Sequence, residues 1–309
     1  MKINMKKIVI TIFTVVFYLS CDDNQKPSEL VSDVKLENII EKVEPPNWWI
    51  GMKTVDLQIL VYGENINDLV PKINNPSIKL NSFDKFENKN YLFLNVSITE
   101  NAKPGNVEID FYRANTIVER QDFILKDRLD GAEDVKGFST EDVMYLITPD
   151  RYANGDLNND DIEYMRERPN REDIWGLHGG DIQGIINNLD YIKEMGFTTV
   201  WLNPVLENNM ERASYHGYST TDYYKIDPRF GTNELFKELS LKSKDMGIKL
   251  VMDMIPNHCG SFHWFFKDPP MKNWFNNQNE YKRTSHRRQT VQDIYASEID
   301  KKEHADGWF

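Results

Sequence analysis

The chain has 309 residues, enough for about two globular domains, and its 40% hydrophobic content is sufficient for a packed core. The 49 aspartates and glutamates outnumber the 37 lysines and arginines, which gives a formal net charge of -12. Binding to nucleic acid requires a basic surface that neutralises phosphates, so this charge argues against a nucleic-acid partner.

The N-terminal residues have the pattern of an export signal. Three lysines precede an apolar run from Ile8 to Leu19, which is too short for an ordinary transmembrane helix. Ser20 and Cys21 follow this run and resemble a bacterial lipoprotein cleavage site, at which the cysteine would become the lipidated new N-terminus. Plain secretion with an incidental cysteine is the alternative. We therefore predict a signal peptide over residues 1–20, lipidation at Cys21 and a polar tether over 21–32.

Residues 33–126 predict a small antiparallel β-sandwich. Short apolar runs recur over residues 55–62, 91–98, 107–112 and 122–125, with Asn-Pro, Pro-Gly and Gly-Glu-Asn turns between them. The charged, glycine-containing residues 127–141 predict a linker.

An alternation of strands and helices follows the linker. Residues 143–149, 197–204 and 249–252 predict three strands, and Leu250, Val251 and Met252 have the unbroken apolar character of a strand buried on both faces. Apolar spacing predicts one helix over 181–196, with Asp181 as N-cap and Gly196 as C-cap, and a second over 233–246 that stops at Gly247. This order predicts a parallel α/β domain.

Polar residues come directly after the third of these strands. The sequence turns at once to Asp253, Pro256, Asn257 and His258. Barrel enzymes place their chemistry at the C-terminal ends of such strands, although an ordinary strand end with a polar loop is the alternative.

The loop over residues 150–161 carries several oxygen ligands at close spacing, with a glycine for the turn. Hard cations such as Ca²⁺ prefer oxygen ligands. The loop therefore predicts a calcium site, with a solvated Asn/Asp loop as the alternative.

Three motifs carry a resemblance to a known family. DMIPNH, at 253–258, resembles the first signature region of glycoside hydrolase family 13, the α-amylase family, and DPRFG at 227–231 matches the same pattern. EPPNWWIGMK, at 44–53, resembles the start of the N-terminal domain of cyclomaltodextrinases and neopullulanases, especially bacterial outer-membrane ones. The resemblance implies a β-sandwich, then the first three β/α units of a TIM (β/α)8 barrel over 142–257, and the start of the inserted domain B over 258–309. The barrel is expected to be incomplete.

The resemblance also implies roles for individual residues. The loop matches the ANGD-x-x-ND calcium loop of cyclomaltodextrinase-like enzymes, and its ligands would be Asn154, Asp156, Asn159, Asp160, Gly179 and Asp181. The implied sugar-binding residues are His216, Tyr218, Asn257 and His258. Asp253 would support the catalytic machinery without acting in it.

The family hydrolyses α-1,4 and in some members α-1,6 glucosidic bonds, and its retaining mechanism needs two carboxyl groups about 5 Å apart. No segment of this chain resembles the family's nucleophile or acid/base, so we expect the chain to be inactive on its own. The other interpretations are a non-catalytic module that binds starch oligosaccharides, with Trp48 and Trp49 as a stacking platform, and a non-functional gene fragment. The expected partners are α-glucan oligosaccharides, a membrane reached through the lipid anchor, and other glycan-uptake proteins. The expected location is the outer membrane, on its surface or periplasmic face, because Asp22 and Asp23 resemble the surface-export signals of Bacteroidetes lipoproteins.

Overall fold

The structure is a computed structural model that describes residues 36–131, 135–276 and 297. The predicted signal peptide, Cys21 and the whole of the predicted tether lie outside these residues, as does the greater part of the predicted domain B. None of the helices in the described part of the chain is long and apolar enough to cross a membrane.

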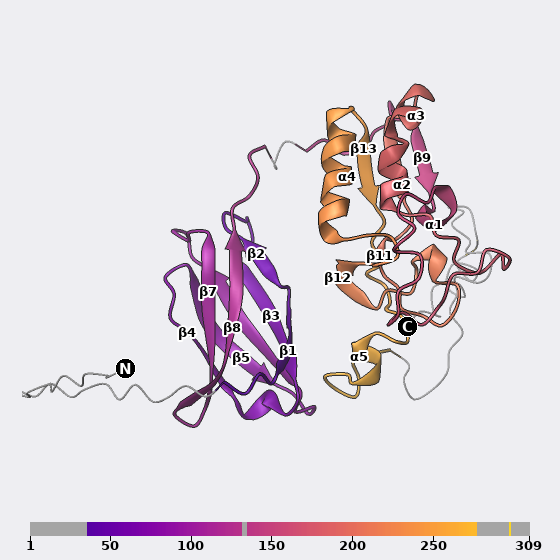
Figure 1. Cartoon of the computed structure of the whole chain (residues 1–309). Coiled ribbons are helices and arrows are strands. Elements are labelled where there is room, and N and C mark those ends of the chain that lie inside the picture. Colours follow the sequence, from indigo (N-terminus) through magenta and orange to yellow (C-terminus); the bar gives the residue numbers. More distant parts are fainter. Residues whose placement is uncertain (1–35, 132–134, 277–296, 298–309) are drawn as a thin grey trace, which may run out of the picture. The chain divides into compact units, whose positions relative to one another are not determined.

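The first part of the chain is a β-sandwich of two four-stranded sheets (Figure 1). One sheet has the strand order β1-β3-β6-β5 and the other the order β2-β8-β7-β4. The strands are β1 (Ile40–Glu44), β2 (Asn47–Trp49), β3 (Asp56–Gly63), β4 (Val70–Ile73), β5 (Ile78–Lys85), β6 (Tyr91–Ile98), β7 (Gly105–Arg113) and β8 (Thr116–Lys126). All neighbouring strands are antiparallel except β2 and β8, which run parallel.

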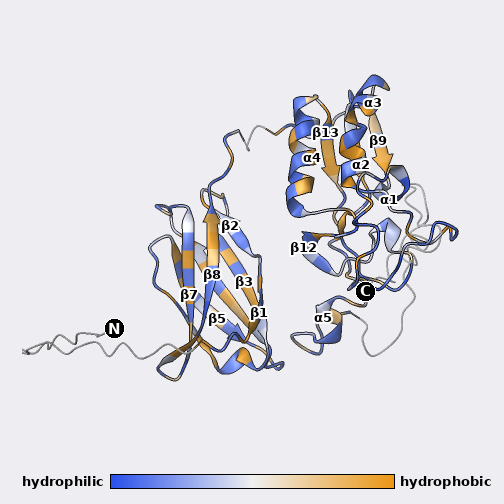
Figure 2. Cartoon of the chain, in the orientation of Figure 1, coloured by the Kyte–Doolittle hydropathy of each residue, from blue (hydrophilic) through white to orange (hydrophobic). Residues whose placement is uncertain are grey.

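The sandwich core is formed by the inward-facing side chains of both sheets. Ile59, Leu94, Ile109 and Phe123 are all fully buried, and Figure 2 shows hydrophobic and hydrophilic bands alternating along β7 and β8. Such alternation is what two sheets packed face to face require. The four predicted apolar runs correspond to β3, β6, β7 and β8. The sequence did not reveal β1, β2, β4 and β5, which are the outer strands of the two sheets and carry more polar side chains.

The second part of the chain contains the predicted parallel sheet. Its strands are β9 (Met144–Ile147), β10 (Thr199–Leu202) and β13 (Lys249–Met252), in the order β13-β10-β9. The helices are α1 (Pro149–Tyr152), α2 (Ile182–Asn187), α3 (Leu189–Glu194), α4 (Asn233–Asp245) and α5 (Trp264–Lys267). Smaller elements of this part are the antiparallel pair β11 (Leu206–Glu207) and β12 (Asp222–Ile226), and the 3-10 turn η3 (Ser214–His216), whereas the 3-10 turn η1 (Ile66–Asp68) belongs to the sandwich. The predicted fold class, a sandwich followed by the first β/α units of a barrel, is confirmed.

The helix predicted over 181–196 is interrupted. It forms α2 and α3, which are separated by Asn188, whose φ of -117° and ψ of 14° are not helical. The Asn188 side-chain amide donates to the Gly184 carbonyl at 2.7 Å, so it competes locally for a helix acceptor. The N-cap prediction is confirmed, because the Asp181 carboxylate accepts from the Gly184 N–H at 2.6 Å.

The prediction that the third strand is buried on both faces is wrong. Leu250 and Val251 are only partly buried, and Met252 is 37% exposed. Side chains of β10 that face α2 and α4, such as Val200, are buried, whereas Trp201 on the opposite face is 37% exposed. The physical reason is that β13 is an edge strand of this sheet and that helices pack against one face only within the described residues.

Candidate functional site

The polar residues predicted to bind a ligand meet around Tyr218. Its hydroxyl donates to the Asp253 carboxylate at 3.0 Å, at the C-terminal end of β13. Its carbonyl lies 2.8 Å from Nε2 of His258, and its backbone N–H donates to Nδ1 of His216 at 2.9 Å. Residues about 40 positions apart in the sequence are therefore joined through one tyrosine.

The hydrogen bonds assign the proton on His258. A carbonyl can only accept, so Nε2 carries the hydrogen that is donated to Tyr218. Nδ1 then accepts from the side-chain amide of Asn257 at 3.1 Å. The His258 carbonyl in turn accepts from the Tyr223 hydroxyl at 2.6 Å. His258 is thus oriented from both sides of its ring and through its backbone.

The groups at this site favour a neutral ligand. Burial, followed by the hydrogen bond and charge of Asp253, raises the pKa of Tyr218, so its phenol remains a proton donor at neutral pH. Burial lowers the pKa of His216, which keeps that imidazole uncharged. Tyr218 is 37% exposed, so its ring can be reached from solvent. A flat aromatic ring surrounded by oriented hydrogen-bonding groups suits a sugar better than a charged ligand.

Glycine at position 217 is required by the shape of this loop. Gly217 has a φ of +78°, and a Cβ added there would lie 2.0 Å from the carbonyl oxygen of Pro204, which follows β10. The loop that carries His216 and Tyr218 is therefore pressed against the end of a barrel strand.

The predicted metal ligands lie together in the segment between β9 and α2. The side-chain amide of Asn154 contacts the Asp160 carboxylate at 2.6 Å, and Gly179, with a φ of +86°, lies against both. The Asp181 carboxylate accepts from the N–H groups of Gly155, Asp156 and Gly184 and from the amide of Asn159. Asp181 therefore organises the loop and caps α2 at the same time.

The donor set of this loop fits a hard cation. The side-chain oxygens of Asn154 and Asn159 are buried and have no hydrogen-bond donor, although buried carbonyl oxygens nearly always have one. An oxygen-binding cation would satisfy both. The described residues contain no group of three His, Cys, Asp or Glu side chains that could hold a metal, so amide oxygens are an essential part of this candidate site.

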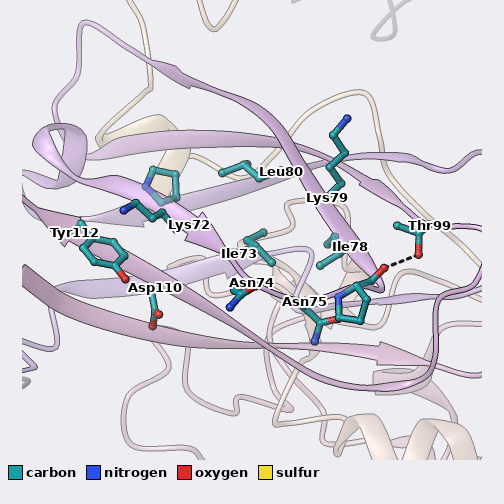
Figure 3. Close-up of a pocket in the computed structure, with 12 residues that line it drawn as sticks. Lys72, Ile73, Asn74, Asn75, Ile78, Lys79, Leu80, Thr99, Asp110 and Tyr112 are labelled. Carbon is teal, nitrogen blue, oxygen red and sulfur yellow. Dashed lines mark hydrogen bonds between the residues drawn. The ribbon is translucent and has the colours of Figure 1, made fainter. Parts of the chain in front are cut away.

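A cavity of about 940 Å³ lies elsewhere, on the sandwich beside the edge strands β4 and β5 (Figure 3). It is lined by Lys72, Asn74, Asn75, Asp110 and Tyr112 among others. The ammonium group of Lys72 lies 4.2 Å from the centre of the Tyr112 ring and so occupies one of its faces. One stacking face of this tyrosine is therefore already covered by a charged side chain.

The two adjacent tryptophans of the sandwich have different surroundings. Trp48 packs against the sandwich core and its indole N–H is buried without a hydrogen-bond partner, whereas Trp49 is 38% exposed. Their ring centres are 5.9 Å apart with an angle of 60° between the planes, so the rings do not form one flat platform.

Sequence reasoning missed several residues that hold the site together. Glu167, Asp227 and Arg229 are all buried. Glu167 binds the backbone of the loop that carries His216, and Asp227 and Arg229 bind the backbone of Asn208. Each is an ordinary charged residue in the sequence, and only DPRFG gave any signal of the last two.

Comparison with known families gives two matches. The family model described as "Alpha amylase, catalytic domain" matches residues 146–306, and "Cyclomaltodextrinase, N-terminal" matches residues 42–129. These correspond to the α/β part and the sandwich.

The alignments with individual relatives each cover somewhat less than half of this chain. A β/α-amylase from Paenibacillus polymyxa is 43% identical over 44% of this chain and 12% of its own length. A cyclomaltodextrinase from Thermoanaerobacter pseudethanolicus is 38% identical over 42% of this chain and 22% of its own length. A solved α-amylase from Anoxybacillus is 41% identical over 47% of this chain and 29% of its own, with a TM-score of 0.41. The chain thus spans less than a third of each of these proteins.

Proposed function

Because the chain belongs to the α-amylase family, whose catalytic-domain model matches over half of its length, we propose that it acts on the α-glucosidic bonds of starch-derived oligosaccharides. The observation that carries this proposal is the arrangement of Tyr218, His258 and Asp253 at the end of β13. Cyclomaltodextrinase is the name of one of the relatives, and a cyclic or linear maltodextrin is the substrate class that we propose here.

In this proposal Tyr218 stacks against a glucose ring. Its exposed face supplies apolar contact area, and Nε2 of His216, whose Nδ1 accepts from the Tyr218 N–H, supplies a hydrogen bond to a sugar hydroxyl. Both ring nitrogens of His258 bind within the protein, so His258 holds the Tyr218 carbonyl in place. Asn257, which is exposed and adjacent to His258, supplies a further amide. Asp253 acts in support, because its carboxylate already accepts the Tyr218 hydroxyl and so fixes the direction of that ring.

Hydrolysis itself would follow the retaining route, in which two carboxyl groups about 5 Å apart act on opposite sides of the bond. The role assigned to Asp253 leaves it outside that pair. The residues assembled around Tyr218 therefore bind and orient the sugar, and Asp253 takes no direct part in its cleavage.

The test is a comparison of tyrosine variants by isothermal titration with maltoheptaose and β-cyclodextrin. Tyr218→Ala should weaken binding at least about tenfold, because the contact area between the aromatic ring and the sugar ring is lost. Tyr218→Phe keeps the ring and should bind more tightly than Tyr218→Ala. Tyr224→Ala is the matched control, since Tyr224 is 44% exposed and lies in the same segment. Equal affinities of Tyr218→Ala and Tyr224→Ala, or the absence of binding by the wild type, would contradict the proposal that Tyr218 binds the sugar.

We also propose that the loop between β9 and α2 binds Ca²⁺. The two buried, unpartnered amide oxygens of Asn154 and Asn159 support this, together with the neighbouring carboxylate of Asp160. Asp156, the carbonyl of Gly179 and Asp181 complete the proposed ligand set. The ion would supply charge that holds the loop in place, and nothing in the sugar-binding residues requires it as a reactant.

A lipid anchor at Cys21 and an outer-membrane location remain part of the proposed function. They are supported by the basic and apolar pattern of residues 1–20 and by the serine that precedes the cysteine. Stable anchoring needs more than one acyl chain, as lipoprotein processing provides. Mass spectrometry of the mature N-terminus tests this proposal, and a free thiol at Cys21 or cleavage at another position would contradict it.

A further inference from the structure

A buried charged cluster lies beneath the loop that carries the proposed sugar-binding residues. Its members are Glu167, Asp227 and Arg229, which are 9%, 0% and 3% exposed. Nε and Nη2 of Arg229 bind the two carboxylate oxygens of Asp227 at 2.9 and 2.8 Å, a bidentate pair. The same two side chains hold Asn208, whose N–H donates to Asp227 at 3.0 Å and whose carbonyl accepts from Arg229 at 2.9 Å.

Glu167 binds the start of the turn η3 directly. One carboxylate oxygen accepts from the N–H of Ala213 at 3.0 Å and the other from the N–H of Ser214 at 2.6 Å. Ala213 has a φ of +58°, in the left-handed region that an alanine adopts at a cost. Two charge-assisted hydrogen bonds at this point oppose that cost. The glutamate reaches them from a position 47 residues earlier in the chain.

The turn that Glu167 holds leads within a few residues to His216 and Tyr218. The Ser214 carbonyl accepts from the side-chain amide of Asn208. Glu167 therefore binds the N–H of Ser214, and Asn208, which Asp227 and Arg229 hold, binds its carbonyl. Gly217 is pressed against the Pro204 carbonyl on the other side. Between these two fixed points the backbone has little freedom, and the directions of the His216 and Tyr218 side chains follow from it.

We propose that Glu167 is a positioning residue, whose carboxylate fixes the 213–218 turn so that His216 and Tyr218 are presented to the sugar. Arg229 and Asp227 hold the neighbouring backbone at Asn208 in the same way. This inference rests on the proposed function, since the sugar is the ligand that the turn serves.

The test is Glu167→Gln in the full chain, with Glu163→Gln as the matched control. A carboxamide has one acceptor oxygen, so the variant loses one of the two backbone hydrogen bonds with almost no change in size. Glu163 is exposed and lies in the same segment. The affinity of Glu167→Gln for β-cyclodextrin should fall about tenfold, which corresponds to one hydrogen bond to a charged group, while Glu163→Gln should bind like the wild type.

The pKa of His216, followed by NMR, separates positioning from a simple charge effect. Burial lowers this pKa and the charge of Glu167 raises it, while Tyr215 and Tyr218 are the rings in contact with the imidazole. If Glu167→Gln left the turn in place, loss of the charge would lower the pKa further. If Glu167 positions the turn, its loss releases the ring to water and the pKa rises toward its ordinary value.

A rise in the His216 pKa together with weaker binding supports the proposal. A lower pKa with unchanged affinity overturns it, and so does a higher pKa with unchanged affinity. If Glu167→Gln melts before it can be titrated, Ala213→Gly is added to it, because glycine adopts the left-handed conformation without strain. The double variant should then recover part of the lost affinity, and failure to recover any would count against positioning. If the wild type binds neither sugar, the proposed function fails, whereas the pKa of His216 still tests the role of Glu167.

Discussion

At the scale of single residues, the structure separates what a motif can reveal from what only the fold can. Tyr218, His258 and Asp253 belong to short stretches whose composition is informative, and the structure brings them into contact. Glu167 has no such stretch around it. Its role depends on meeting the backbone of Ser214, and nothing in the local sequence specifies a contact across 47 residues.

His263 is a buried histidine whose charge state should affect stability. It is 1% exposed, its Nδ1 accepts from the Phe265 N–H at 3.0 Å, and burial lowers its pKa from 6.5 to about 4. The unfolded chain takes up a proton below pH 6.5, whereas the folded chain does so only near pH 4. The stabilisation is therefore fully present above about pH 6.5 and is lost as the pH falls toward 4.

We expect the wild type to lose about 2 kcal/mol more stability between pH 7 and pH 5 than the variant His263→Asn. Asparagine keeps a side-chain acceptor at the N-terminus of α5 but cannot be protonated in this range. Urea unfolding at several pH values measures the difference. Parallel pH dependences of the two proteins would show that His263 is not buried in its neutral form.

At the scale of elements, periodicity predicted those with a buried face and missed those without one. The inner strands β3, β6, β7 and β8 and the helix α4 were all indicated by their apolar spacing. The outer strand β5 has mostly partly buried or exposed side chains, so its sequence carries no clear pattern. The break between α2 and α3 depends on one side-chain hydrogen bond of Asn188, which spacing alone cannot reveal.

The loop between β9 and α2 gives a prediction at this scale. If it binds Ca²⁺, the ion stabilises the native state by about 2.7 kcal/mol when its concentration is 100 times the dissociation constant. Thermal melting with Ca²⁺ or with a chelator should therefore differ for the wild type. The variant Asp156→Ala should lose this response, because a proposed ligand is removed.

Asp161→Ala is the control for this experiment. Asp161 lies next to the proposed ligand Asp160 and its carboxylate pairs with Arg168, so its removal takes away the same charge without touching the proposed site. It should keep the calcium response. Equal responses of Asp156→Ala and Asp161→Ala would contradict the ligand assignment. Loss of the response only in Asp161→Ala would mean that Asp161, and not Asp156, is a calcium ligand.

At the scale of the whole molecule, the α/β part differs from the sandwich in how its sheet is covered. The sandwich buries the inner faces of both sheets against each other. In the described residues of the α/β part, helices pack against one face of the sheet, and the other face carries Leu146 and Trp201, which are 52% and 37% exposed. Within the described residues this face of the sheet therefore presents apolar side chains to water.

An open apolar face should bind the dye ANS, which detects accessible hydrophobic surface. We expect the full chain to enhance ANS fluorescence in its native state and expect Leu146→Ser to reduce this signal, because the variant removes apolar area from the centre of the face. Leu241→Ser is a closely matched control, since Leu241 lies on α4 and is also 52% exposed. A single exposed leucine on a helix surface is ordinary and offers the dye no continuous patch, so this variant should leave the signal unchanged. Equal reductions in the two variants would mean that the dye binds exposed leucines individually and that the sheet face is not a continuous apolar surface in solution.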